Sequence, residues 1–257
     1  GIDTTGFARM AADAAVTDGA LSAALAAIGD TPFAIAIDRI DYSKAIPERI
    51  EAFAAFRARR PDTPAALLQV AVPSRTEIPA YREEDARIAR AAAAFARAVP
   101  GGEGLHLVRS TVDRPSLAAA CRRARVGLVT PRRDGMNLVA KEYLAAQDPD
   151  DPGVLILSPG AGSADTLGAA ALLASPDDEE TVIAALERAF AMNPAERRRR
   201  FEAVMPVLEA HDATRWACTF VDRLAARPIR RVGATPRRWR APASPRAAQR
   251  TPLPADA

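Results

Sequence analysis

The stretch VGLVTPRRDGMNLVAKEY, residues 126–143, sets out a strand, a loop and a helix in direct succession. Its apolar start predicts a buried strand, and the pattern from Asn137 onward predicts a helix. A loop that leads into a helix start offers free backbone N–H groups and the positive end of a helix dipole, which together suit a phosphate. Asp134 and Glu142 could both face a ligand over this helix start. One acid could then meet a sugar on one side of a diphosphate, and the other a ribose on the far side.

The same succession of strand, loop and helix repeats on both sides of this stretch. Short apolar runs predict strands at residues 33–37, 65–72, 105–109, 126–130 and 154–157, with a short sixth at 170–173. After a short irregular segment, helices are expected at residues 18–28, 47–59, 79–98, 113–123, 137–146, 178–191, 195–210 and 212–225. Strands that alternate with helices predict an α/β fold with a doubly wound, parallel, Rossmann-like sheet.

Polar loops follow the predicted strands, at residues 38–45, 73–75, 109–111, 130–137 and 158–163. In a doubly wound sheet, ligands bind outside the carboxyl ends of the strands. Because the carboxyl ends of parallel strands lie at one edge, we expect these loops to contribute to one shared site.

Composition divides the chain into two parts. Of its 257 residues, 49% are hydrophobic and 26% charged, which is typical of a globular protein. Residues 1–226 are predicted to form one ligand-binding domain. Residues 227–257 are rich in proline and hold eight arginines against one acid, so they are predicted to be a disordered tail. The tail therefore carries a formal charge of +7, which leaves −4 for residues 1–226 of a chain whose net charge is +3. A basic arm could touch nucleic acid, but a solvated tail is the favoured interpretation because aromatic residues are nearly absent from it.

The sequence gives no indication of a membrane, a metal or a cofactor. No apolar run is long enough to cross a bilayer and no signal-peptide pattern opens the chain, so a cytoplasmic protein is expected. Cys121 and Cys218 are interpreted as free thiols. His106 and His211 lack metal-type spacing and are interpreted as structural.

Two cations follow the first predicted strand. Arg39 and Lys44 could neutralise the diphosphate of a nucleotide sugar, since arginine offers a fork of donors and lysine a point charge. The alternative is an ordinary solvated loop in which Lys44 pairs with Asp41. Arg109, after the third predicted strand, is a further candidate anion ligand.

The loop after the fourth predicted strand supplies the remaining candidates, in the run from Asp134 to Val139 that comprises Gly135, Met136, Asn137 and Leu138. Gly135 would let the backbone approach a ligand. Asn137 is a good N-cap in either interpretation. Glu142, about one turn into the helix, could accept hydrogen bonds from ribose hydroxyls or simply favour the helix dipole.

Four segments carry a resemblance to a known family: DRIDYSKAIPERIEAF (38–53), LLQVAVPSRTEIPAY (67–81), the run 107–147 that ends in DGMNLVAKEYLAAQ, and DPGVLILSPGAG (151–162). They resemble the C-terminal half of trehalose-6-phosphate synthases, which are retaining glucosyltransferases with the two-domain GT-B fold. The resemblance extends over about residues 1–224. It implies glucosyl transfer from a nucleotide-glucose (UDP-glucose commonly, GDP- or ADP-glucose in some members) to glucose 6-phosphate, without a metal or a side-chain nucleophile.

The resemblance also implies roles for individual residues. Arg39 and Lys44 would bind the donor diphosphate and act in catalysis. The segment 134–139 would contact the glucose and the phosphates. Glu142 would hold the ribose, and Arg109 would help to bind the phosphate of glucose 6-phosphate.

Three departures from the family pattern shape the expectations. The N-terminal domain, which binds most of the acceptor, has no counterpart here, so the chain alone is expected to bind a nucleotide sugar weakly and to turn over poorly. Ala45 stands where glycine is usual, and SPGAG (158–162) stands where the family reads SEFAG. The chain is thus either half of an enzyme whose N-terminal half is separately encoded or lost, or a non-catalytic module. Such a module would bind and sense a nucleotide sugar, or act in regulation by pairing with a full-length synthase. A GT-B transferase with another acceptor is a weaker alternative.

Overall fold

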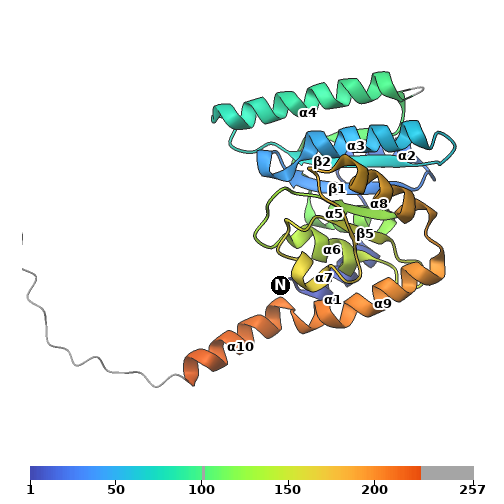
Figure 1. The fold of residues 1–257 in the computed structure, drawn as a ribbon. Helices are drawn as coiled ribbons and strands as arrows, with labels where there is room; N and C mark the ends of the chain where they lie inside the picture. Colours follow the sequence, from blue (N-terminus) through green and yellow to red (C-terminus); the bar gives the residue numbers. More distant parts are fainter. Residues whose placement is uncertain (100–101, 227–257) are drawn as a thin grey trace, which may run out of the picture.

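A computed structural model describes residues 1–99 and 102–226, and the predicted tail lies outside the described residues. Six parallel strands form one sheet in the order β3-β2-β1-β4-β5-β6 (Figure 1). The strands are β1 Phe33–Arg39, β2 Ala66–Val72, β3 Leu105–Val108, β4 Val126–Val129, β5 Val154–Leu157 and β6 Leu172–Leu173. The predicted α/β fold is confirmed, including the short sixth strand.

Both faces of the sheet are covered by helices, as the continuously apolar strands require. Successive residues of a strand point to opposite faces. Accordingly, Ile35 joins one core cluster, whereas its neighbours Ala34 and Ala36 join the other. The first core is lined by α1, α2, α5, α6 and α9, and the second by α3, α4 and α8.

The helices agree closely with expectation except at the start of the chain and at the short α7, neither of which was predicted. They are α1 Thr4–Asp13, α2 Gly19–Ile28, α3 Ile46–Arg59, α4 Pro79–Ala98, α5 Arg114–Arg123, α6 Leu138–Ala146, α7 Ala164–Leu167, α8 Glu179–Ala191, α9 Pro194–Ala210 and α10 Ala213–Ala225. The irregular segment predicted before residue 18 was wrong, because residues 4–13 form α1. Asp3 caps this helix by accepting from the Gly6 N–H, and Phe7 and Ala11 are buried in the core. Tertiary packing outweighs the low helix propensity of Thr4, Thr5 and Gly6.

Strand β1 is two residues longer than predicted. Asp38 and Arg39, expected in a loop, continue the strand because β2 continues beside them, with Asp38 opposite Ala71 and Arg39 opposite Val72. The strand order then fixes where a ligand site can form. From β1 the chain runs outward through β2 to β3, and then crosses to β4 on the other side of β1. The loops after β1 and β4 therefore flank the point where the strand order reverses, which is where open α/β sheets bind ligands.

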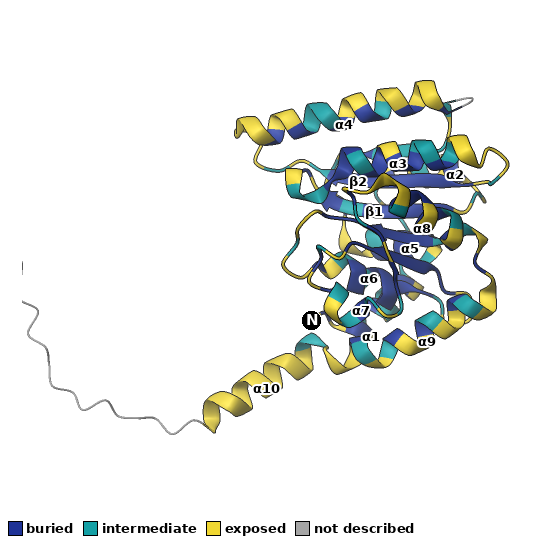
Figure 2. Cartoon of the chain, viewed as in Figure 1, coloured by how far each residue is buried: buried dark blue, intermediate teal, exposed yellow. Residues whose placement is uncertain are grey.

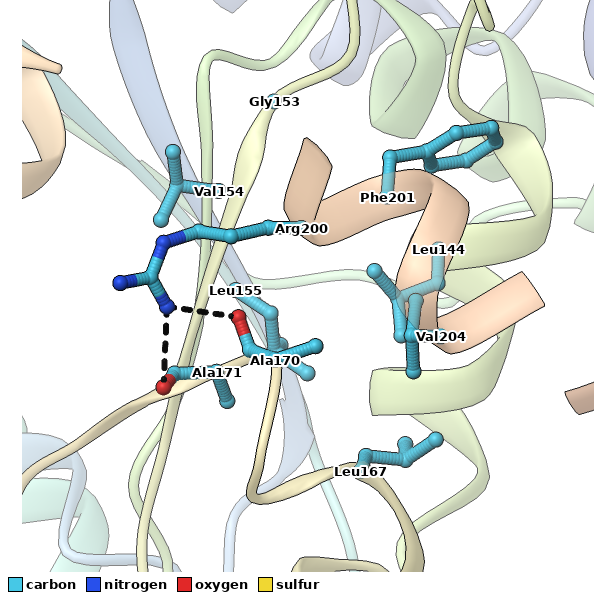
Figure 3. Close-up of a pocket in the computed structure, with 10 residues that line it drawn as sticks. All are labelled: Leu144, Gly153, Val154, Leu155, Leu167, Ala170, Ala171, Arg200, Phe201 and Val204. Atoms are coloured by element: carbon cyan, nitrogen blue, oxygen red, sulfur yellow. Dashed lines mark hydrogen bonds between the residues drawn. The ribbon is translucent and has the colours of Figure 1, made fainter. Parts of the chain in front are cut away.

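Helix α9 is fixed on the sheet by a small apolar contact surface (Figure 3). Phe201 and Val204 of α9 face Leu144 and Leu155 across a narrow cavity. At the rim, the Arg200 guanidinium donates to the carbonyl of Ala170, at 3.0 Å. Apart from Arg200, the side chains that line this cavity are apolar, and none of them belongs to the loops after β1 and β4.

Helix α10 differs from all the others in the described part of the chain. It continues beyond the body of the domain, and none of its residues is buried (Figure 2). Within residues 1–99 and 102–226, no helix combines the length and the apolar character that crossing a bilayer would need.

Candidate functional site

The loops after β1 and β4 are joined by direct contacts. The Arg132 N–H donates to the Ser43 carbonyl at 2.8 Å, which ties the two loops together through the backbone. The Lys44 ammonium lies 2.5 Å from an Asp134 carboxylate oxygen and 3.8 Å from Asp38. The switch point of the sheet therefore holds one lysine between two carboxylates, Asp38 near the end of β1 and Asp134 in the loop after β4.

The turn that carries Lys44 is shaped by its own side chains. After β1 the chain forms a short 3-10 helix, η1 Tyr42–Lys44, capped by Asp41, whose carboxylate accepts from the Ser43 N–H at 2.9 Å. Asp41 also accepts from the Tyr81 hydroxyl at 3.2 Å. The alternative in which Lys44 pairs with Asp41 is therefore wrong, since Lys44 faces Asp38 and Asp134 instead.

Asp134 is the centre of the second loop. Besides Lys44, its carboxylate accepts from the Asn137 side-chain amide at 3.0 Å, and Asn137 in turn accepts from the Ala140 N–H at 3.0 Å as the N-cap of α6. Partial burial acts to raise the pKa of Asp134, but the hydrogen bond and charge of Lys44 outweigh it and hold that pKa below its ordinary value. Asp134 is therefore an anion that binds Lys44 beside the start of α6.

The backbone of this loop takes its unusual conformation at Asn137 and not at Gly135. Gly135 does not adopt a positive φ, whereas Asn137 does, with φ 65°. A Cβ on Gly135 would meet open space. Met136 and Leu138 are exposed beside it and Val139 is half-buried. Gly135 therefore has open space beside its Cα and is not required by a left-handed backbone conformation.

A cluster of buried polar residues supports the two loops, and the sequence analysis missed it. Arg49 of α3 is 1% exposed and donates to Asp38, Gln69 and Thr130, at 2.7, 2.9 and 3.0 Å. Burial raises the pKa of Asp38, while the charges of Arg49 and Lys44 oppose that rise. A sequence signal existed, because Arg49 occupies a core position of a helix whose neighbouring core positions are Ile46, Phe53 and Phe56.

Arg39 and Arg109 are not brought into contact with Lys44. Arg39 ends β1 with an exposed side chain, and it makes no hydrogen bond or ion pair with another described residue. Arg109 follows β3, two strands from β1, and pairs with Asp85 of α4. Of the predicted cations, Lys44 alone therefore contacts the loop that begins α6.

Glu142 faces a different cation from Asp134. It accepts from the Arg114 guanidinium, at the start of α5, at 3.1 Å. Burial raises the pKa of Glu142, and the charge of Arg114 opposes that rise. Among residues 1–99 and 102–226, no cluster of three or more His, Cys, Asp or Glu side chains could hold a metal ion.

Comparison with known proteins identifies the family. The sequence profile of glycosyltransferase family 20 matches residues 1–226. The chain belongs to glycosyltransferase family 20. It is 40% identical over 230 residues to the trehalose-6-phosphate synthase of Sinorhizobium fredii (strain NBRC 101917 / NGR234), covering 88% of this chain and 49% of that protein.

Solved structures confirm the fold of this family 20 chain. The UDP-forming alpha,alpha-trehalose-phosphate synthase of Burkholderia xenovorans superposes with a TM-score of 0.82 at 33% identity, covering 88% of this chain and 51% of that one. The trehalose-6-phosphate synthase of E. coli bound with UDP-2-fluoro glucose gives 0.81 at 35% identity, covering 89% and 51%. The chain spans about half the length of the relatives it matches.

The two departures from the family pattern have different structural consequences. Ala45 adopts the left-handed conformation, φ 53° and ψ 44°, so an alanine at this position carries a strain of about 1 kcal/mol. The 158–162 loop, by contrast, keeps close backbone contacts. The Asp134 N–H donates to Gly160 at 3.0 Å, and the Gly162 N–H donates to Asp134 at 2.9 Å. The 158–162 loop therefore stays hydrogen-bonded to the loop that begins α6, although it lacks the acid and the aromatic residue of the family pattern.

Proposed function

We propose that this family 20 chain is the nucleotide-sugar-binding part of a trehalose-6-phosphate synthase. It binds a nucleotide-glucose, with UDP-glucose as the first candidate. When an acceptor-binding domain completes the site, the glucosyl group of this donor is transferred to glucose 6-phosphate and the nucleoside diphosphate leaves. The observation that carries the proposal is the Lys44 ammonium, 2.5 Å from Asp134 at the start of α6 and at the switch point of the sheet. The match to family 20 over residues 1–226 supports the same reaction class.

The roles in this proposal follow from charge and position. Lys44 and Arg39 neutralise the diphosphate as its bond to glucose breaks, so that their effect is largest where charge develops. Residues 134–139 contact the glucose and the phosphates through the free N–H groups at the start of α6. The Glu142 carboxylate accepts hydrogen bonds from the ribose hydroxyls. Arg114 orients this carboxylate by donating a hydrogen bond to it. Arg109 helps to bind the phosphate group of the acceptor, glucose 6-phosphate.

Partner and location are parts of the same proposal. The chain spans about half of its relatives, and the partner that we propose is an N-terminal acceptor domain, supplied separately or by a full-length synthase. We propose a cytoplasmic location, in keeping with Cys121 and Cys218 as free thiols.

Calorimetric titration tests the donor site directly. UDP-, GDP- and ADP-glucose are titrated into the wild-type chain and into Lys44→Ala and Arg39→Ala. Loss of one charge-assisted hydrogen bond should weaken binding by about 10-fold to 100-fold for Lys44→Ala. Arg125→Ala is a matched control, because Arg125 precedes β4 at the opposite edge of the sheet and pairs with Asp151. Unchanged affinity in both site variants would refute the site.

A second function, a non-catalytic binding module, is favoured by the half-length match to the relatives. Turnover separates the two functions. The chain is assayed with UDP-glucose and glucose 6-phosphate, alone and with the N-terminal half of a family 20 relative added. Turnover that depends on the added half supports the enzyme, whereas binding without turnover in either mixture supports the module.

A further inference from the structure

One buried arginine connects every element that surrounds Lys44. Arg49 extends from α3, and its side chain is entirely buried. The guanidinium donates to Asp38 at the end of β1, to Gln69 in β2 and to Thr130 after β4. A further N–H donates to the backbone carbonyl of Lys44 at 3.2 Å. Four acceptors from four separate segments thus converge on one side chain that has no access to a ligand.

Arg49 acts on Lys44 in two ways. Its bond to the Lys44 carbonyl fixes the peptide that leads into Ala45, where the backbone is left-handed. Its bond to one oxygen of Asp38, at 2.7 Å, leaves the other oxygen toward the Lys44 ammonium, at 3.8 Å. Both the backbone of the lysine and one partner of its ammonium are therefore set by the same guanidinium.

We infer that Arg49 is a positioning residue for the donor site, which places the Lys44 ammonium at the switch point of the sheet. The inference rests on the proposed function for its link to a nucleotide sugar, but the placement of Lys44 is measurable without one. Arg49 acts through Lys44 and does not touch the ligand.

The geometry of arginine explains why lysine cannot replace it here. A guanidinium carries five N–H donors in a planar fork, and Arg49 uses it to reach acceptors on two strands, on the loop after β4 and on the turn after β1. A lysine ammonium keeps the charge that balances Asp38 but concentrates its donors at one point. Arg49→Lys should therefore preserve the buried charge pair while releasing the Lys44 backbone.

Arg197 provides a matched control. It is also buried, at 5% exposure, and it joins α9 to the loop before β5 through the Pro152 carbonyl at 2.6 Å and the Asp151 carboxylate at 2.6 Å. It lies away from the loops that hold Lys44. Arg197→Lys should therefore reproduce the general cost of disturbing a buried arginine without changing the placement of Lys44.

The chain offers an unusually clean measurement, because Lys44 and Lys141 are the only lysines among its 35 basic residues. Brief acetylation followed by peptide mass spectrometry gives the ratio of Lys44 to Lys141 modification in one sample. Arg49→Lys should raise this ratio by about fivefold or more, equivalent to about 1 kcal/mol of lost restraint. Arg197→Lys should leave the ratio unchanged. A ratio in Arg49→Lys equal to that in Arg197→Lys overturns the inference.

A second variant and a ligand measurement complete the test. Thr130→Val removes one acceptor without changing side-chain shape, so it should raise the ratio in the same direction by a smaller factor even if Arg49→Lys does not fold. Titration with UDP-glucose should then show about tenfold weaker binding for Arg49→Lys than for Arg197→Lys. If the ratio changes but wild-type chain binds no UDP-glucose, the proposed function fails and the positioning role stands. If wild-type chain binds and neither Arg49→Lys nor Thr130→Val changes the ratio, the positioning role fails alone.

Discussion

The loops at the switch point and helix α10 depart from ordinary burial in opposite directions. At the switch point, charged and polar side chains are inside, with Asp38 8% and Arg49 1% exposed. Along α10, large apolar side chains are outside, with Trp216 65%, Phe220 50% and Val221 60% exposed (Figure 2). Burial of polar side chains costs free energy unless they are hydrogen-bonded. Exposed apolar patches on a soluble domain mark contact surfaces or a tendency to aggregate.

The two regions differ in whether their side chains find partners within the described part of the chain. Arg49 finds four acceptors within the domain, so the described residues are sufficient to hold the switch point together. No residue of α10 is buried against the described part of the chain, and the Trp216 ring stacks on Phe220, with ring centroids 5.3 Å apart. The switch point should therefore be sensitive to small changes, and α10 should tolerate large ones.

The largest effect is expected at the contact between the loop after β4, which carries Gly135, and the loop after β5, which carries Gly162. A Cβ on Gly162 would lie 2.2 Å from the Gly135 carbonyl, which is backbone and cannot move aside cheaply. Gly162→Val should therefore separate the loops, lower the free energy of unfolding by about 1–3 kcal/mol and abolish UDP-glucose binding. Urea denaturation and calorimetric titration measure the two effects.

Gly135→Ala is the matched control, because a Cβ there meets open space and the residue has no positive φ. Its free energy of unfolding should stay within about 0.5 kcal/mol of the wild type. Equal destabilisation by the two substitutions would contradict the close contact at Gly162.

Ala45→Gly should stabilise the chain. Ala45 is fully buried in a left-handed conformation, which glycine adopts without strain, so a gain of about 1 kcal/mol in the free energy of unfolding is expected. Ala54→Gly, inside α3, should instead cost about 0.5–1 kcal/mol. A loss of stability in Ala45→Gly would mean that the turn does not need the left-handed conformation.

The pH dependence of stability should reveal the Lys44–Asp134 pair. The pKa of Asp134 is lowered in the folded chain, so its contribution is fully present above its ordinary pKa of 3.8 and is lost as pH falls through the folded value. Asp134→Asn should therefore lose less stability than the wild type between pH 6 and pH 3, as measured by urea denaturation. Other acids with lowered pKa values, such as Asp41 and Glu48, are present in both proteins and cancel. Parallel loss in both proteins would contradict the pair.

The sequence predicted the sheet and the loop that begins α6, because both depend on local patterns. Apolar runs identify strands, and Asn137 is recognisable as an N-cap from its neighbours. The contact between Lys44 and Asp134 joins residues 90 positions apart, and no local pattern specifies which of several acids a lysine meets. For the same reason the Asp41 alternative could not be rejected before the structure was known.

Local sequence patterns also failed to predict helix α1 and the contacts of Arg49, for different physical reasons. Helix α1 forms because Phe7 and Ala11 pack into the core, which outweighs the propensities of its first residues. The role of Arg49 depends on acceptors from β1, β2 and the end of β4, and these become neighbours only in the assembled sheet. The sequence shows Arg49 at a position of α3 that is otherwise apolar, but it does not show which acceptors the guanidinium meets.

The smallest effect on the free energy of unfolding is expected for substitutions in α10. These substitutions test the contrast between α10 and the switch point most directly. Trp216→Ser together with Phe220→Ser should leave the free energy of unfolding within about 0.5 kcal/mol of the wild type, because neither side chain is buried. Phe53→Ala is the matched aromatic control. Phe53 is fully buried and stacks on Phe95, with centroids 6.2 Å apart, so its loss should cost about 3–5 kcal/mol. If the double variant of α10 loses stability comparable to Phe53→Ala, the apolar face of α10 is packed against protein in solution, and the contrast with the switch point disappears.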